Sequence, residues 1–247
     1  MNEAGIAGAA ALLAAARTGP AIGGLSPGPK TMAEAEAIQL TTLAALSLRR
    51  GGWKLGRSEG LVFSAPMPAG PMDEAEPVLA LPAGSRIELE IALRFREPPP
   101  RAELTPEALP ALADLVVLIE FVRTRFAGPV TVLDRIADCI SNERVVAVTA
   151  PGPWSPAILE TLPLVQLFQD DVEIARHQGA HPAAPVMPLL NAWQARCAEA
   201  GLAIGVGEVV TLGSLTGVLP VPAGGARFLG RIGGLPPVRC RVRALPA

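Results

Sequence analysis

The sequence lacks the features that mark several classes of protein. It has no tyrosine, three cysteines, and nearly equal numbers of acidic and basic residues, 23 and 21. No uninterrupted apolar run approaches the roughly 18 residues that span a bilayer. The net charge of -2 is too small to indicate binding to nucleic acid or to an anionic membrane. We therefore expect the partner to be a small molecule or another copy of the chain.

The cysteines and the N-terminal run bear on the cellular compartment. Cys139, Cys197 and Cys240 are odd in number and form no C-x-x-C pair, which argues against a disulfide framework or a thiolate metal site and fits a reducing compartment. The run IAGAAALLAAAR is apolar enough to suggest a signal peptide, but Glu3 stands where such a peptide carries positive charge. We interpret the run as a helix and expect a cytoplasmic protein.

What the sequence does contain is a large apolar fraction divided into many short segments. Half of the 247 residues are apolar, and the 25 glycines and 26 prolines are spread between apolar runs, as turns are. Helices are expected at about 3–17, 31–50, 105–114 and 186–201. The second begins with a capping-box pattern, Thr31 followed by Glu34, and we expect Gly51 and Gly52 to end it.

Short runs typical of β-strands fill most of the remaining chain. They are WKLG, RIELEIALRF, LVVLIEFVRTRF, RVVAVTAP, LVQLFQDDVEIAR, GEVVTLGSLTGVLPV, ARFLGRIG and PVRCRVRAL. The pattern predicts an α+β protein in which a helical N-terminal segment, 1–58, packs on a strand-rich body, 59–247, as one structural unit.

Residues 86–95, RIELEIALRF, raise the question of chemistry. Side chains alternate along a strand, so Glu88 and Glu90 lie on one face, about 6–7 Å apart. On pattern alone a half-exposed strand with a solvated acidic face is favoured. Two such carboxylates can also hold Mg²⁺ or Mn²⁺, which prefer oxygen ligands. Glu120 is a third candidate ligand, because it lies inside the apolar run VVLIEFV, where an unpaired buried carboxylate costs several kcal/mol.

Several spaced pieces of the chain carry a family resemblance. They are AEAIQ at 35–39, GWKLG at 52–56, IELEIALRF at 87–95, IEFVRTRF at 119–126, IADCIS at 136–141, and the stretch 190–217 that ends in GSLTG. Taken in order, they resemble the 2-keto-4-pentenoate hydratase and 4-oxalocrotonate decarboxylase branch of the fumarylacetoacetate hydrolase superfamily. Each piece is common by chance, whereas the ordered set covers nearly the whole chain.

The resemblance implies a fold, a metal site and a reaction class. The fold is a mixed β-roll or barrel with flanking helices, and Mg²⁺ or Mn²⁺ is held by Glu88, Glu90 and Glu120. The substrate is a 2-oxo or 2-hydroxy-dienoic acid, whose enolate the cation stabilises. The resemblance thus predicts a lyase, either a hydratase of the 2-keto-4-pentenoate type or, as the alternative, a decarboxylase of the 4-oxalocrotonate type.

Other assemblies and reactions remain open at this point. The chain is expected to form a homo-oligomer or a complex with a related subunit. A protein of the same fold that binds a keto acid without converting it, or that serves as the partner of an active homologue, is a further alternative. A carbon–carbon hydrolase of acylpyruvates is disfavoured, because that branch usually has aspartate as the third carboxylate, where this chain has Glu120.

The resemblance also implies roles for residues outside the carboxylates. Lys54 matches a lysine that binds substrate and takes part in proton transfer, and burial near a metal would lower its pKa. Without the resemblance, a solvated lysine after a turn is equally expected. Ser214 and Thr216 are candidates for binding the substrate carboxylate, although hydroxyls in glycine-rich turns more often cap local backbone. Arg57 is a further substrate-binding candidate.

Some positions depart from the family pattern. Glu36 stands where the family usually has tyrosine, and Arg123 where it usually has aspartate. The segment between Lys54 and Glu88 is short and lacks the acidic residue that accompanies the lysine in some hydratases. The acidic partner of Lys54 is then expected to be Asp73 or Glu59, or to be absent.

The two histidines have the H-x-x-x-H spacing of a helical zinc pair. Gly179 lies between His177 and His181, and Pro182 follows them, which makes a helix unfavourable there. We interpret both histidines as loop residues rather than zinc ligands.

Overall fold

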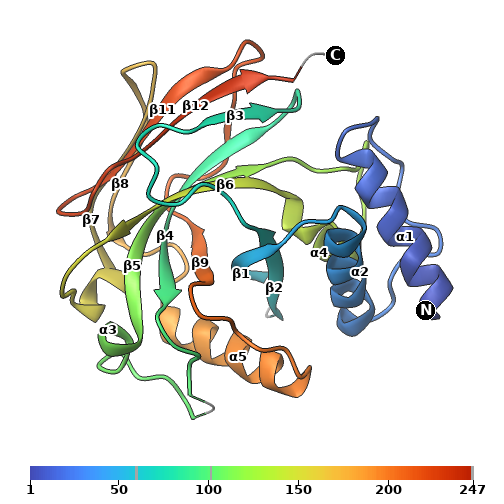
Figure 1. Cartoon of the computed structure of the whole chain (residues 1–247), viewed down its shortest axis with the longest axis horizontal. Coiled ribbons are helices and arrows are strands. Elements are labelled where there is room, and N and C mark those ends of the chain that lie inside the picture. Colours follow the sequence, from blue (N-terminus) through green and yellow to red (C-terminus); the bar gives the residue numbers. More distant parts are fainter. Residues whose placement is uncertain (59–60, 101, 246–247) are drawn as a thin grey trace.

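The computed structural model describes all residues except 59–60, 101 and 246–247, and consists of two β-sheets flanked by helices (Figure 1). The helices are α1 (Glu3–Ala16), α2 (Met32–Ala45), α3 (Leu109–Leu112), α4 (Val132–Ala137) and α5 (Val186–Glu199). The strands are β1 (Arg50–Ser58), β2 (Leu61–Pro68), β3 (Val78–Leu81), β4 (Arg86–Phe95), β5 (Ala113–Val122), β6 (Asn142–Ala150), β7 (Thr161–Gln169), β8 (Val172–Ala180), β9 (Val209–Ser214), β10 (Leu219–Pro220), β11 (Ala226–Ile232) and β12 (Val238–Ala244).

The larger sheet forms the predicted roll. Its order is β2-β1-β9-β4-β5-β6, with β10 added to β4. The sheet curls until the segment after β2 meets β6, where Ala147 N donates to Pro71 O at 3.0 Å and Asp73 N donates to Ala147 O at 2.9 Å. The edge strands β2 and β6 do not pair with each other, so the described strands form an open roll rather than a closed barrel.

The second sheet, in the order β3-β12-β11-β7-β8, covers the outer face of the roll. The odd-numbered residues of β4 and β5 point toward it and form the main core. Phe121 packs edge-on against Phe228 of β11, with ring centroids 6.1 Å apart. The sheets approach closely at Gly230, where an added Cβ would lie 2.4 Å from a Leu89 methyl carbon. The even-numbered side chains of β4 and β5 are therefore left for the interior of the roll.

The helices close two sides of the roll. Helices α1, α2 and α4 gather at one side, and α5 lies across one end of the strands (Figure 1). Buried Gln39 of α2 ties this side together, donating to Ser64 O of β2 at 3.1 Å and to Ile136 O of α4 at 2.6 Å. On α5, Trp193 packs against Trp53 of β1, with ring centroids 6.4 Å apart. No helix among the described residues is long and apolar enough to cross a membrane.

Several predicted boundaries are wrong. Helix α2 ends at Ala45, and the two glycines expected to end it, Gly51 and Gly52, belong to β1 instead. An added Cβ on Gly52 would lie 1.9 Å from Val209 O. The helix expected at 105–114 is reduced to the four residues of α3, and β5 begins at Ala113. The run LVQLFQDDVEIAR is two strands, β7 and β8, joined at Asp170 and Asp171, which both adopt positive φ.

The loop interpretation is wrong for His177, which lies in β8, whereas His181 follows that strand. The two rings do not share a site: His177 Nε2 lies 2.9 Å from Ala180 O, and His181 Nδ1 accepts from Ala183 N at 3.0 Å. The structure thus shows neither the helix nor the pairing that a zinc site on these two residues would need.

His181 predicts a loss of stability in mild acid. The side chain is 2% exposed, and burial, with a smaller effect of His177, lowers its pKa from 6.5 to about 4. The unfolded chain therefore binds a proton between these values that the folded chain does not, and stability falls as the pH drops from 6.5 to about 4. We expect this term to reach about 3 kcal/mol. Denaturant unfolding across this range should show a shallower decline for His181→Gln, and an identical decline would contradict it.

Candidate metal centre

Strand register brings the three predicted glutamates together. Glu88 of β4 lies directly opposite Glu120 of β5, and Glu90 follows two residues along on the same face. One carboxylate oxygen from each lies within 4.8 Å of the others. Glu120 is 0% exposed and Glu90 1%, so this face of the roll is buried rather than solvated. The solvated interpretation of RIELEIALRF, favoured by pattern alone, is therefore wrong.

Lys54 enters the same cluster from β1. Its ammonium donates to Glu120 Oε1 at 2.8 Å and to Ile140 O at 3.3 Å, and it lies 4.0 Å from Glu88 Oε2. The lysine is 7% exposed, which excludes the alternative of a solvated side chain after a turn. A single buried cation thus faces three buried carboxylates.

The electrostatics follow from this excess of negative charge. Burial and the neighbouring carboxylates raise the pKa of Glu90 well above its usual value of 4.5. Burial also raises the pKa of Glu88, partly offset by Lys54. For Lys54 without a metal, burial acts to lower the pKa, but the combined attraction of the three carboxylates is larger, and the pKa is raised. The lowered pKa expected beside a bound metal stays a prediction.

The donor set fits a divalent cation. Oε2 of Glu90 and Oε2 of Glu120 are buried without a hydrogen-bond partner in the described chain. An unpartnered buried carboxylate oxygen is unfavourable unless a positive group completes its environment. Three carboxylates and one ammonium leave a charge of -2 when all are ionised, and oxygen ligands suit Mg²⁺, Mn²⁺ and Ca²⁺. Glu88, Glu90 and Glu120 would hold the ion, and the interior of the roll provides the pocket.

Asn142, at the start of β6, was missed by the sequence analysis. Its side-chain amide is fully buried and donates to Glu120 Oε1 at 2.8 Å, which orients the carboxylate that Lys54 also contacts. The signal that could have identified it is its position directly after IADCIS, one of the segments that carry the family resemblance. Residues 139–141 before it all adopt positive φ.

Buried arginines hold this turn in place. Arg17 of the segment after α1 donates to Glu143 O at 2.8 Å, and Arg125 donates to Asn142 O. The same arginines lie near two buried acids: Arg125 Nε is 3.3 Å from Asp138 Oδ1, and Arg17 Nη2 is 3.6 Å from Glu143 Oε1. The N-terminal helical segment thus reaches the turn that carries Asn142.

A cavity of about 510 Å³ opens beside the cluster. Its lining includes Lys54 and Glu88, with Arg86 and Arg123 adding positive charge. Arg123, which replaces the aspartate of the family pattern, donates to Ala16 O at 3.1 Å and so also fixes the end of α1. A negatively charged ligand in this cavity would lie within reach of both Lys54 and the glutamates.

The three substrate-binding candidates lie in different environments, and their roles stay predictions. Ser214 lies beside the Glu88 carboxylate, and its hydroxyl oxygen is buried without a hydrogen-bond partner in the described chain. Thr216 Oγ1 accepts from Leu89 N at 3.1 Å and donates to Gly217 O at 3.3 Å, so it serves local backbone. Arg57 is exposed and lines, with Ser214, a separate hollow of about 380 Å³.

Two of the acids considered as partners of Lys54 lie elsewhere or outside the described residues. The Asp73 carboxylate accepts from Thr149 N at 2.7 Å, away from the contacts of Lys54. Glu59 lies outside the described residues. Glu36, in the position of the family tyrosine, pairs with Arg196 of α5. Among the described residues, the groups that Lys54 pairs with are therefore Glu120, Glu88 and the Ile140 carbonyl.

Known structures share this fold over most of the chain. The 4-oxalocrotonate decarboxylase of Pseudomonas putida G7, complexed with magnesium and adipate, matches with a TM-score of 0.76 and 20% identity over 98% of both chains. The fumarylpyruvate hydrolase of Pseudomonas aeruginosa, in complex with Mn²⁺ and pyruvate, matches with a TM-score of 0.52 and 15% identity over 80% of this chain and 91% of that one. The chain therefore has the mixed α+β fold of these structures, which is the fold class that the sequence predicted.

Comparison by sequence, unlike comparison by structure, finds no match for this chain. No family model matches the chain, and no curated protein matches it in sequence. The fold therefore rests on the structural match, and the site rests on the geometry of its own residues.

The raised pKa values of Glu88 and Glu90 predict that cation binding depends on pH. Above pH 4.5 the folded chain retains protons on these carboxyl groups that the unfolded chain has lost, so the metal-free protein loses stability as the pH rises. A bound cation displaces those protons. We expect the increase in melting temperature caused by Mn²⁺ to grow between about pH 5 and about pH 8. Thermal melts with and without Mn²⁺ measure this, and a pH-independent increase would contradict it.

Proposed function

We propose that the chain is a divalent-metal-dependent lyase acting on 2-oxo or 2-hydroxy-dienoic acids. The observation that carries the proposal is the cluster of Glu88, Glu90 and Glu120, with oxygens within 4.8 Å of one another, beside buried Lys54 and an open cavity. A divalent cation bound there supplies a Lewis acid to the carboxylate and 2-oxo oxygens of such an acid. We propose that this cation is Mg²⁺ or Mn²⁺.

The residues of this chain then have distinct tasks. The Lys54 ammonium lines the cavity and holds a proton that it can donate to the substrate chain. Glu120 and the Ile140 carbonyl position that ammonium, and Asn142 positions Glu120 in turn. Arg86 and Arg123 place positive charge at the cavity, which attracts an acidic substrate.

Of the two lyase reactions, decarboxylation has the stronger support. The structural match to the 4-oxalocrotonate decarboxylase extends over 98% of both chains. Hydration is the second candidate, because a Lewis acid at the 2-oxo group would also stabilise the enolate formed when water adds to a conjugated acid. A non-catalytic keto-acid-binding subunit is the alternative that turnover would eliminate.

A direct assay separates these possibilities. The full chain is incubated with Mg²⁺ or Mn²⁺ and either 2-oxohex-3-enedioate or 2-hydroxypenta-2,4-dienoate, while ultraviolet absorbance, released carbon dioxide and product mass are followed. Carbon dioxide release from the first acid supports the decarboxylase, and a product heavier by one water from the second supports the hydratase. Binding of the cation and both acids without turnover would reject the enzyme and favour the binding subunit.

A further inference from the structure

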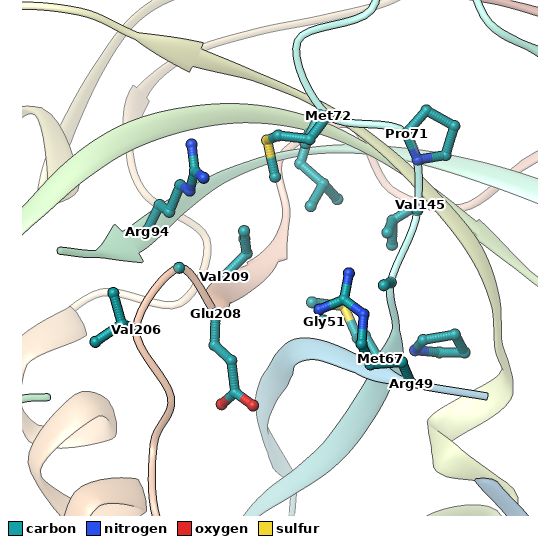
Figure 2. Close-up of a pocket in the computed structure, with 16 residues that line it drawn as sticks. Arg49, Gly51, Met67, Pro71, Met72, Arg94, Val145, Val206, Glu208 and Val209 are labelled. Atoms are coloured by element: carbon teal, nitrogen blue, oxygen red, sulfur yellow. The ribbon is translucent and has the colours of Figure 1, made fainter. Parts of the chain in front are cut away.

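A second cavity, whose lining does not include Lys54, lies inside the roll (Figure 2). Its volume is about 250 Å³, and its lining comes from β2 and the segment after it, from β4, β5 and β6, and from the loop before β9. Arg94, which lines it, is six residues along β4 from Glu88, or roughly 20 Å. Leu118, also in its wall, is the register partner of Glu90. The cavity therefore lies behind the metal centre and is separate from its mouth.

Two guanidinium groups supply the charge of this rear cavity. Figure 2 shows the side chains of Arg49 and Arg94 reaching into it from opposite walls. Arg49 makes no ion pair with any described residue. Arg94 has one acidic neighbour, Asp73, at 3.7 Å, and that carboxylate already accepts hydrogen bonds from Thr149 N at 2.7 Å and Thr149 Oγ1 at 3.1 Å.

The acid in the lining does not neutralise these arginines. Glu208 accepts from Arg50 Nε at 2.7 Å and from Trp53 Nε1 at 3.1 Å. In Figure 2 its carboxylate points away from Arg49 and Arg94. Arg94 Nη1 also donates to Thr149 Oγ1 at 3.4 Å, so this guanidinium is partly engaged. The cavity thus keeps two positive groups, of which Arg49 has no side-chain partner among the described residues.

Between the two arginines the wall is apolar. Met67, Met72, Leu118 and Val209 line it, and Gly207, with φ of 79°, leaves room where a Cβ would lie 3.9 Å from Arg94 Nη2. At a share of about 30 Å³ per water, the volume corresponds to about eight waters, enough for an organic acid of a few carbons. Guanidinium groups bind carboxylates in a bidentate geometry.

We propose that the rear cavity binds a small organic dicarboxylate, with one carboxylate on Arg49, the other on Arg94, and the carbon chain against Met67 and Leu118. The apolar wall between two separated positive groups favours this ligand over a compact anion such as phosphate. The site is distinct from the glutamate cluster, because the hydrogen bonds and ion pairs of Arg94 and Glu208 among the described residues involve neither Lys54 nor the three glutamates.

Calorimetric titration of the full chain with succinate tests the proposal. The protein is first treated with EDTA and then dialysed into chelator-free, metal-free buffer, so that no cation at the glutamates can bind the probe. We expect one succinate per chain, at least tenfold weaker binding for Arg49→Gln and for Arg94→Gln, and binding within twofold of wild type for Arg86→Gln, which alters the cavity at the metal centre. Arg49 has no side-chain partner among the described residues, so Arg49→Gln should fold as the wild type does.

Three results would overturn the proposal. The first is that the wild type does not bind succinate. The second is that Arg86→Gln loses succinate binding while Arg49→Gln binds it as the wild type does. The third is that inorganic phosphate binds as tightly as succinate. The second would place the anion at the metal centre, and the third would show a general anion site. The lyase assay is unaffected by each of these outcomes, so the two proposals fail separately.

Discussion

Replacing Glu90 by glutamine is expected to weaken Mn²⁺ binding by about 100-fold or more while making the metal-free protein more stable. The substitution keeps the shape of the side chain and removes a charge whose pKa is raised well above 4.5 by burial and by Glu120 and Glu88. Loss of that charge relieves repulsion, and we expect a gain of about 1 kcal/mol, or roughly 2–4 °C in melting temperature. The loss of a direct ligand should exceed the 10- to 100-fold effect typical of groups that only support a ligand.

Two further variants make this prediction specific. Glu120→Gln should also lose Mn²⁺ binding, but it should lower the stability of the metal-free protein, because Lys54 Nζ loses its 2.8 Å ionic partner. Glu199→Gln, at an exposed position of α5, should change neither property. Isothermal titration and thermal melts measure both. Wild-type Mn²⁺ affinity in Glu90→Gln would reject the metal centre.

Replacing Lys54 by methionine is expected to have the opposite effect on stability and a large effect on turnover. The metal-free protein then buries three carboxylates without a counter-charge, and removing one partner of a buried ion pair costs about 3–5 kcal/mol. Added Mn²⁺ should restore more stability to this variant than to the wild type, because the cation becomes the sole positive group in the cluster. If Lys54 transfers a proton to substrate, turnover should fall by about 10² to 10⁴ with the cation bound.

Lys30→Met is the matched control, because Lys30 is exposed and lies outside the cluster. It should leave the melting temperature, Mn²⁺ affinity and turnover unchanged. Retention of turnover within about threefold in Lys54→Met would remove the lysine from proton transfer while leaving the metal centre intact. A Lys54→Met protein that is as stable as wild type without metal would contradict the buried ion-pair geometry itself.

The strand RIELEIALRF shows that a local sequence pattern does not predict which face of a strand is buried. Alternation correctly places Glu88 and Glu90 on one face of β4. Which face is buried depends on β5 and β1, which lie in other parts of the chain and bring Glu120 and Lys54 to that face. The family resemblance supplied this long-range information, and it is why the three glutamates were chosen despite a pattern typical of a solvated strand.

The errors have the same origin. Gly51 and Gly52 look like a helix end in sequence, yet they lie in β1 where neighbouring backbone leaves no room for a Cβ. A Cβ on Gly51 would lie 2.5 Å from Ala69 Cα, after β2, and one on Gly52 would lie 1.9 Å from Val209 O of β9. Asp73 is near Lys54 in sequence, but the turn after β2 carries it to Thr149 of β6. Asn142 contributes to the site only because β6 begins beside Glu120.

The sequence by itself determined the α+β class, the short strands, and which side chains carry oxygen atoms of the kind that a divalent cation prefers, since these follow from composition, period-two alternation and side-chain chemistry. The tertiary structure decided which carboxylates meet, that Lys54 is their counter-charge, and that a second cavity with Arg49 and Arg94 lies behind them. The physical reason is that charge, burial and cavity volume arise between strands distant in sequence, where local preference carries no information.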